Sequence, residues 1–492
     1  MRKEILRMEH VTYKEEDKVL LQDFDLNVFE GEVMGLLPMG AYGLPAFLHI
    51  LAEYPPLYHG YIYYREKLVD SWLEDKNSRN RVSMIGDKSS LVEGQTVLTN
   101  VMILRRGFRQ EVLQIALLKK QLQRFLDEMG LRIDPQLPVE KLTPFERIQI
   151  EILRAVVADH RLIVMQEIST IIGESEMNRL HEIIRRYTKK GFAFLYISPH
   201  FEELQQICDR TAVMTDKRVS KILCGEEMTA NVINRCTTEY ITRVQERISQ
   251  RKECSNRVVF SAEGVTGTYL NHLNFQVREG ECLAVQCLDP KISKELFLFL
   301  LGKKEILSGE VFLEGKSLDK KRMREMAVIM EHPWESMIFP HMSVLDNLRI
   351  CMDHRVPEVW NSKSIQRSLQ KTLAEQMGEN VAEKKISDLT DPQKSELVYM
   401  RVLLQKPRIV FCIQPFKGED LSHRIRIWEL QKKLLDRGTA VVIMAVNMAD
   451  ALSIADRVIR IDKYTHVSEY ERQDFGRLPS TVPWYSLYRG ED

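Results

Sequence analysis

The chain contains two copies of one sequence pattern, and this internal repeat limits the possible folds more than any other feature. Residues 96–100 (TVLTN) return as residues 343–347 (SVLDN), an offset of 347 − 100 = 247. Collinear matches spread over most of each half indicate a duplicated domain. The other matches pair 30–32 with 279–281 at an offset of 249, and 161–164 with 408–411 and 207–210 with 454–457 at 247.

Each half is predicted to be an α/β domain. An early apolar run of strand length leads into a loop and a periodic helix, and two later apolar runs flank an amphipathic helix, as in a parallel βαβ unit. We therefore expect a mainly parallel sheet, an antiparallel β part and a helical subdomain in each half. The predicted strands are 32–37, 162–165, 193–197 and 281–286, and the helices are 44–51, 112–129, 177–190, 294–301 and 360–377.

The composition is that of an ordinary globular chain of several domains. Its 70 basic residues balance its 70 acidic residues, so no overall field favours nucleic acid as a partner. The N-terminus lacks the apolar core of a secretion signal, and no run approaches the roughly 18 apolar residues of a membrane span. We expect a cytoplasmic protein, peripheral to the inner face of the membrane through a partner. The eight scattered cysteines are expected to be reduced thiols.

The repeat also predicts the domain boundaries. The first domain is expected at residues 1–240, a polar linker at 241–256, the second domain at 257–470 and a tail at 471–492. The tail includes an aromatic segment, 480–488, that has no counterpart in the first half. Its Trp484 and Tyr485 either anchor a partner or pack the tail onto the domain.

Several motifs resemble those of the tandem ATP-binding subunits of ABC-type monosaccharide and nucleoside importers. A strand, loop, helix and later strand ending in an acid is the plan of P-loop nucleoside triphosphate hydrolases. The similar segments are 142–144, 149–152, 165–169 (MQEIS), 196–203 (YISPHFEE) and 207–210 (ICDR), and the resemblance runs from about Glu4 to about Asp462.

This resemblance implies a set of cofactors and partners. The cofactors of the family are ATP and Mg²⁺. Its partners are integral-membrane permease subunits and, indirectly, a sugar-binding protein, and its two cassettes pair head to tail within one chain. The residues at the family's site positions depart from its pattern, so this chain is identified as a degenerate member.

The phosphate-binding loop of the first half has lost its main ligands. Such a loop needs glycine N–H groups around the phosphates, a lysine on the β/γ oxygens and a hydroxyl on Mg²⁺. Within residues 38–45, which include Gly40, only Gly43 retains a family glycine. Leu44 takes the lysine position and Pro45 the hydroxyl position.

The corresponding loop of the second half, residues 287–294, is altered differently. Ser293 takes the lysine position and Lys294 the hydroxyl position, and Ile292 replaces a glycine. A β-branched residue is a poor substitute where close approach is needed. Lys291 and Lys294 either reach a phosphate or remain solvated.

The metal and water site is also depleted. The family places an aspartate and then a catalytic glutamate after an apolar strand. The first half has Gln166 and Glu167, and the second has Ile413 and Gln414, so Glu167 is the one retained catalytic carboxylate and no metal ligand set is predicted.

The switch and coupling positions have changed as well. The switch histidine falls at Pro199 and Val446; His200 is adjacent to the first, but neighbouring residues of an extended chain face opposite ways. The family glutamine that couples the metal to the transporter interface falls at Asp87 and Glu331. Asp87 and Glu331 are expected to contact the partner subunit more than to take part in the reaction.

The signature loops keep a hydroxyl at Thr143 and Thr390. Phe145 and Asp391 are expected to place bulk and negative charge where a γ-phosphate docks. Tyr13 stands at the position of the aromatic residue that stacks on adenine, and it either binds a base or is simply a half-buried strand residue.

These changes leave three functions open. The first is a pseudo-ATPase subunit that docks on a permease. The second is a divergent active ATPase using Glu167 and Tyr13 to energise carbohydrate import, and the third is a soluble regulator or scaffold. Two-cassette translation factors are disfavoured, because residues 241–256 are too short and too mixed to form their long charged linker.

Overall fold

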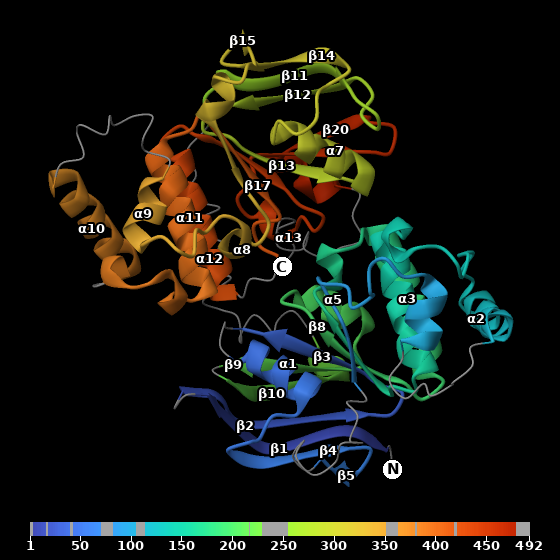
Figure 1. Ribbon diagram of the computed structural model, residues 1–492. Coiled ribbons are helices and arrows are strands. Elements are labelled where there is room, and N and C mark those ends of the chain that lie inside the picture. Colours follow the sequence, from blue (N-terminus) through green and yellow to red (C-terminus); the bar gives the residue numbers. More distant parts are fainter. Residues whose placement is uncertain are drawn as a thin grey trace. The chain divides into compact units, whose positions relative to one another are not determined.

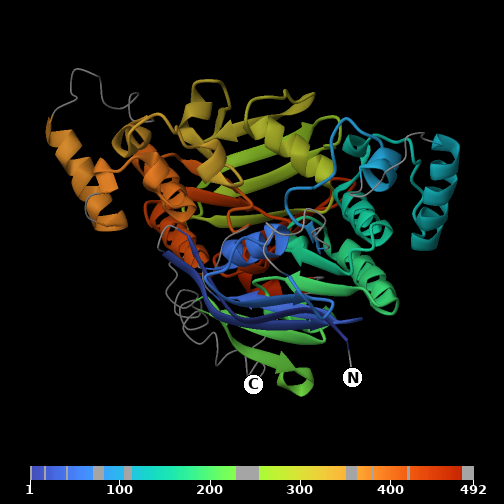
Figure 2. The same cartoon turned by 60° about the horizontal axis from the view of Figure 1, so that its bottom comes forward.

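The chain folds into two compact units, each with its own pair of β-sheets (Figure 1, Figure 2). The first unit is built mainly from the chain up to Ile241 and the second mainly from the chain after it. Of the predicted linker only residues 254–256 are described, and Trp484 and Tyr485 lie outside the described residues. The computed structural model describes residues 3–15, 18–39, 43–69, 82–104, 114–215, 217–228, 254–350, 363–378, 381–417 and 421–478.

The first unit combines an antiparallel sheet with a mainly parallel one. The four-stranded antiparallel sheet has the order β2-β1-β4-β5, and the six-stranded sheet has the order β10-β9-β3-β8-β7-β6 with only β10 antiparallel to its neighbour. The strands are β1 (Glu4–Glu15), β2 (Lys18–Phe29), β3 (Val33–Pro38), β4 (His59–Tyr64), β5 (Lys67–Leu68), β6 (Val82–Ile85), β7 (Leu162–Gln166), β8 (Ala193–Ile197), β9 (Arg210–Thr215) and β10 (Arg218–Cys224).

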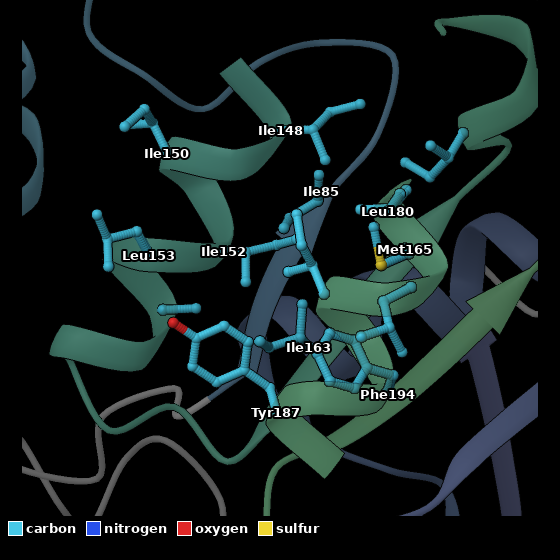
Figure 3. Packing of buried hydrophobic residues seen from close by; sticks show 14 of the residues in the cluster. Ile85, Ile148, Ile150, Ile152, Leu153, Ile163, Met165, Leu180, Tyr187 and Phe194 are labelled. Atoms are coloured by element: carbon cyan, nitrogen blue, oxygen red, sulfur yellow. The ribbon is translucent and has the colours of Figure 1, made fainter. Parts of the chain in front are cut away.

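Two hydrophobic cores cover the two faces of this parallel sheet. Because side chains alternate along a strand, Ile163 and Met165 of β7 join one core, whereas Leu162 and Val164 join the other. The first core contains α3 and α4, as Figure 3 shows for Ile163 and its labelled neighbours. The second contains α1 and the antiparallel sheet. The helices are α1 (Leu44–Glu53), α2 (Ile115–Met129), α3 (Pro144–Val157), α4 (Glu174–Thr188) and α5 (Phe201–Ile207).

The second unit repeats this topology strand for strand, which confirms the predicted duplication and fold class. Its sheets have the orders β12-β11-β14-β15 and β16-β17-β18-β13-β19-β20, with β20 antiparallel at the edge. The strands are β11 (Val258–Thr266), β12 (Leu273–Arg278), β13 (Cys282–Cys287), β14 (Ser308–Leu313), β15 (Lys316–Ser317), β16 (Met326–Ile329), β17 (Ile409–Ile413), β18 (Ala440–Met444), β19 (Arg457–Ile461) and β20 (Val467–Glu471). The helices are α7 (Pro290–Leu300), α8 (Pro333–Ser336), α9 (Val344–Arg349), α10 (Lys363–Met377), α11 (Asp391–Gln405), α12 (Leu421–Leu435) and α13 (Ala449–Leu452).

A buried asparagine makes the same hydrogen bonds in both units. The Asn100 side chain accepts from the Val92 N–H at 2.7 Å and donates to the carbonyls of Val92 and Thr96. Asn347 makes the equivalent bonds to Phe339 and Ser343, each 247 residues further on. Both asparagines are fully buried, so these bonds satisfy polar groups that would otherwise be costly to bury.

A buried glutamate–arginine pair holds the start of the central strand in each unit. The Glu32 carboxylate lies 2.6 Å from Arg210 Nε, and Glu281 lies 2.8 Å from Arg457 Nε. Both glutamates are only 1% exposed. Each pair joins the residue before the central strand to the next strand of the parallel sheet.

We expect Glu281→Gln to destabilise the second unit by about 3 kcal/mol, because the substitution removes the buried counter-charge of Arg457 and leaves this guanidinium only the half-exposed Glu469 carboxylate. Chemical denaturation followed by tryptophan fluorescence measures this change. The control is Glu375→Gln, which breaks an exposed pair with Lys371 and is expected to change stability by less than about 0.5 kcal/mol. Equal effects of the two substitutions would contradict the role of the buried pair.

Candidate functional site

The loop, metal and switch positions follow the carboxyl ends of parallel strands, where α/β sheets bind ligands. In the first unit the loop between β3 and α1 ends at Gly43, whose φ of 105° favours glycine. A Cβ there would lie 2.6 Å from Met214 Cε and 3.1 Å from the Leu20 carbonyl oxygen. Close packing within the fold therefore accounts for this glycine. Gly40 lies outside the described residues.

The two residues after Gly43 do not offer phosphate or metal ligands. Leu44 is half-buried and packs against the hydrophobic core beneath α1. Pro45 is exposed in the first turn of that helix. The lysine position is thus occupied by a side chain that stabilises the core, and the hydroxyl position has no oxygen to bind Mg²⁺.

In the second unit the phosphate-binding loop is replaced by a two-residue connection. Strand β13 ends at Cys287 and α7 begins at Pro290, so the prediction that this helix begins at Lys294 was wrong. Asp289 caps the helix by accepting from the Lys291 N–H at 2.7 Å, and proline at the first position is compatible with the start of a helix. The connection contains only Leu288 and Asp289, too few residues for their backbone N–H groups to surround phosphates.

The remaining positions of the predicted loop lie on α7. Ile292 is 1% exposed and belongs to the hydrophobic core, while Lys291 and Lys294 are exposed. Ser293 is half-buried and hydrogen-bonds to the Cys287 thiol. Burial raises the pKa of this thiol to about 12, although the Ser293 bond opposes the change.

Sequence reasoning missed Glu295, which follows these positions directly. Its carboxylate is 4% exposed and accepts from the backbone N–H groups of Thr268, Tyr269 and Leu270 at 2.6–2.9 Å, and it also binds the Lys304 ammonium. Burial tends to raise its pKa, but Lys304 and the three N–H groups outweigh that effect and lower the pKa to about 2. An isolated glutamate after a helix start gave no sequence signal of these distant donors.

The first unit brings Gln166, Glu167 and Asp87 to the ends of β7 and β6. Gln166 is half-buried and Asp87 exposed. Glu167 is 9% exposed and has a φ of 48°. Its N–H donates to the Ile197 carbonyl at 2.9 Å and its carbonyl accepts from the Thr170 hydroxyl at 2.7 Å. The backbone of Glu167 is therefore held in a tight turn after the strand.

The matching edge of the second unit contains a lysine ammonium. Ile413 is half-buried beside the core, and the Gln414 amide donates to Glu331 at 3.5 Å. Lys417, whose side chain is only 8% exposed, binds the Glu331 carboxylate. An apolar side chain, a neutral amide and an ammonium do not fit Mg²⁺, which prefers oxygen ligands. Sequence reasoning missed Lys417, because nothing in its spacing shows that it is buried.

A buried carboxylate organises the switch region of the first unit. Glu203 accepts from the hydroxyls of Tyr196, Ser198 and Ser169 at 2.5, 2.7 and 2.9 Å. His200 is 3% exposed, and its backbone N–H donates to the Ser198 hydroxyl at 3.1 Å. Burial, reinforced by the adjacent Glu203, raises the pKa of Tyr196 well above its ordinary value.

The second unit keeps this carboxylate but changes its partner. Asp450, 247 residues after Glu203, lies 2.6 Å from the guanidinium of fully buried Arg424. The three hydroxyl residues of the first unit correspond to residues without hydroxyl groups, namely Phe416, Ile443 and Ala445. One charged donor thus replaces three neutral ones.

The signature helices are capped by their own side chains. Thr143 accepts from the Glu146 N–H, and the Glu146 carboxylate accepts from the Thr143 N–H at 2.8 Å. Thr390 and Gln393 form the same capping box in the second unit. These bonds occupy helix N-termini that would otherwise favour an anion.

The side chains next to these caps are placed differently. The expectation that Phe145 adds bulk at a docking site was wrong, because it is 3% exposed and packs in the hydrophobic core. Asp391 is exposed and pairs with Lys394 at 2.8 Å. Tyr13 is 7% exposed within the second core of its unit, and its role in base stacking remains a prediction.

We expect the stability contributed by Glu295 to depend on pH. A carboxyl group with a lowered folded-state pKa stabilises the fold above its unfolded pKa, and this contribution is lost as the pH falls through the folded pKa. A change from 4.5 to about 2 corresponds to about 3 kcal/mol at neutral pH. The stability difference between the unmodified protein and Glu295→Gln should therefore shrink between pH 5 and pH 2, as measured by denaturation at each pH. The exposed control Glu305→Gln should show no such trend, and a constant difference for Glu295→Gln would contradict the assignment.

Known proteins similar to this chain align with it over nearly its whole length. No family model matches the sequence. The ribose import ATP-binding protein RbsA 1 of Rubrobacter xylanophilus is 25% identical, with 92% of this chain and 93% of that protein covered. The xylose import ATP-binding protein XylG of Geobacillus kaustophilus is 22% identical, with coverage of 96% and 97%. The galactose/methyl galactoside import ATP-binding protein MglA 1 of Photobacterium profundum is 24% identical, with coverage of 93% and 95%.

Comparison with solved structures supports the same fold. The structure of RNase-L Inhibitor matches with a TM-score of 0.57 and 16% identity, covering 94% of this chain and 90% of that one. Within the described ranges, no helix has the length and apolar character needed to cross a membrane. The matches over nearly the whole length show that this chain is homologous to the ATP-binding proteins of sugar import, and its duplicated topology has the fold of two ABC cassettes in tandem.

Proposed function

We propose that this chain is a cytoplasmic pseudo-ATPase subunit of a sugar-type ABC import assembly. It docks on integral-membrane permease subunits, serves a separate sugar-binding protein indirectly, and does not hydrolyse ATP. The names of the full-length relatives support the import assembly. The two cassettes pair head to tail within the chain, as the resemblance implies.

The single observation that carries the loss of hydrolysis is the two-residue connection between β13 and α7. Phosphate binding by a loop depends on several consecutive N–H groups that converge on the ligand. In the second unit the residues from Pro290 onward, which would form the loop, belong to α7 instead. In the first unit, Leu44 contributes to the core and Pro45 offers no metal ligand.

Docking on a permease is supported by apolar residues that follow the coupling positions. Val92 follows Asp87 and is 49% exposed. Phe339, which lies 247 residues after Val92, follows Glu331 and is 43% exposed. The signature helices hold both segments in the same way. Arg154 donates to the Ser90 carbonyl and Arg401 to the Met337 carbonyl, each at 2.8 Å.

We expect the purified protein to show no saturable release of phosphate from Mg-ATP, alone or with its co-purified membrane partner. Glu167→Gln should leave the background rate unchanged, because a single carboxylate without a phosphate-binding loop or metal ligand cannot assemble the reaction. The matched control is Glu53→Gln, a change at an exposed helix end. Saturable hydrolysis that Glu167→Gln abolishes, while Glu53→Gln does not, would establish the active importer ATPase instead.

We expect Phe339→Glu to reduce the recovery of the protein with cell membranes by several-fold, because a charge would have to be buried at the docking surface. Val92→Glu tests the same position of the first unit. Recovery is measured by sedimentation of membranes and quantitative immunoblotting. Tyr464→Glu is the control, since Tyr464 is 61% exposed and lies outside these segments. Unchanged recovery of both variants, or recovery without any permease, would favour a soluble regulator.

A further inference from the structure

Lys417 is a nearly buried ammonium at the ligand-binding edge of the second unit's parallel sheet. Lysine is rarely buried without a partner, and here the partner is the Glu331 carboxylate. The two residues follow β17 and β16, adjacent parallel strands whose carboxyl ends lie side by side. The cation therefore stands between two strand ends rather than on an outer face.

A short turn holds the lysine in this place. The Lys417 N–H donates to the Gln414 carbonyl at 3.1 Å, and the Gln414 N–H donates to the Met444 carbonyl of β18 at 2.8 Å. The Gln414 side-chain amide reaches the second oxygen of Glu331, and His332 Nε2 lies 3.7 Å from its first oxygen. Donors from two strand ends thus converge on one carboxylate.

The first unit does not repeat this arrangement. The residue 247 positions before Lys417 is Thr170, whose hydroxyl donates to the Glu167 carbonyl at 2.7 Å. A neutral hydroxyl in one unit corresponds to a full positive charge in the other. The lysine is therefore specific to the second unit and is not a requirement of the repeated fold.

We propose that Lys417 is a built-in cation that takes the place of a divalent metal ion at this edge and excludes such an ion from it. The inference rests on the proposed function, because a site where Lys417 replaces the metal ion takes no part in ATP hydrolysis. An ammonium bound to the carboxylate provides the positive charge that a metal ion would supply. The arrangement of these side chains is then independent of the metal-ion concentration, because the cation is part of the chain.

A double-mutant cycle on the full-length protein tests the pairing. Lys417→Met leaves Glu331 without its counter-charge, and we expect the melting temperature to fall by roughly 5 °C or more. Adding Glu331→Gln removes the orphaned charge and should restore most of that loss, and Lys417→Arg should stay close to the unmodified protein. Size-exclusion chromatography and circular dichroism identify variants that fail to fold. A Lys417→Met protein with unchanged stability would overturn the inference.

Titration with MnCl₂ tests the substitution for a metal. Mn²⁺ should raise the melting temperature of Lys417→Met and should not raise that of the unmodified protein or of the double variant. Two results would overturn the inference: stabilisation of the unmodified protein that Glu331→Gln abolishes, or no Mn²⁺ response in Lys417→Met. ATP hydrolysis that depends on Glu167 would overturn the proposed function but not the role of Lys417. Glu167 belongs to the first unit, and the role of Lys417 is tested by melting temperature.

Discussion

The buried pair between a glutamate and an arginine at the start of each central strand is the interaction on which both units depend. In the first unit Glu32 also accepts the Phe29 N–H at 2.7 Å, so one carboxylate joins the end of β2, the entrance to β3 and Arg210 of β9. Glu281 does the same with Arg278 and Arg457. Removing one partner of such a buried pair is strongly destabilising. The pair therefore fixes how the antiparallel and parallel sheets of a unit are joined.

The segments that follow the carboxyl ends of the parallel strands differ between the two units. Two units with one topology place their side chains at equivalent points, yet Glu203 is satisfied by hydroxyls and Asp450 by Arg424. At the carboxyl edge of the second unit, Lys417 pairs with Glu331, and α7 follows β13 after a connection of two residues. The scaffold therefore remains constant while its ligand-binding edge is filled by internal contacts.

The contacts that maintain the fold are separate from those at the strand ends. Apolar alternation along β3, β7 and β8 and the buried ion pairs need no nucleotide. Surface segments such as those around Val92 and Phe339 are held to the signature helices by Arg154 and Arg401. These contacts are different from those at the strand ends, such as the pair between Lys417 and Glu331.

The sequence by itself determined the duplication, the order of the elements and the positions that stand at the site, because strand and helix periodicity and the 247-residue repeat are local or collinear properties. It also predicted that Leu44, Pro45 and Ile413 stand where the family has a lysine, a hydroxyl residue and an aspartate. Only the tertiary structure decided that α7 begins at Pro290, that Phe145 packs in the core, and that Lys417 and Glu295 each find their partners. Helix starts depend on a competition between caps and loops, and burial and pairing depend on residues distant in the chain, so neither can be read from spacing alone.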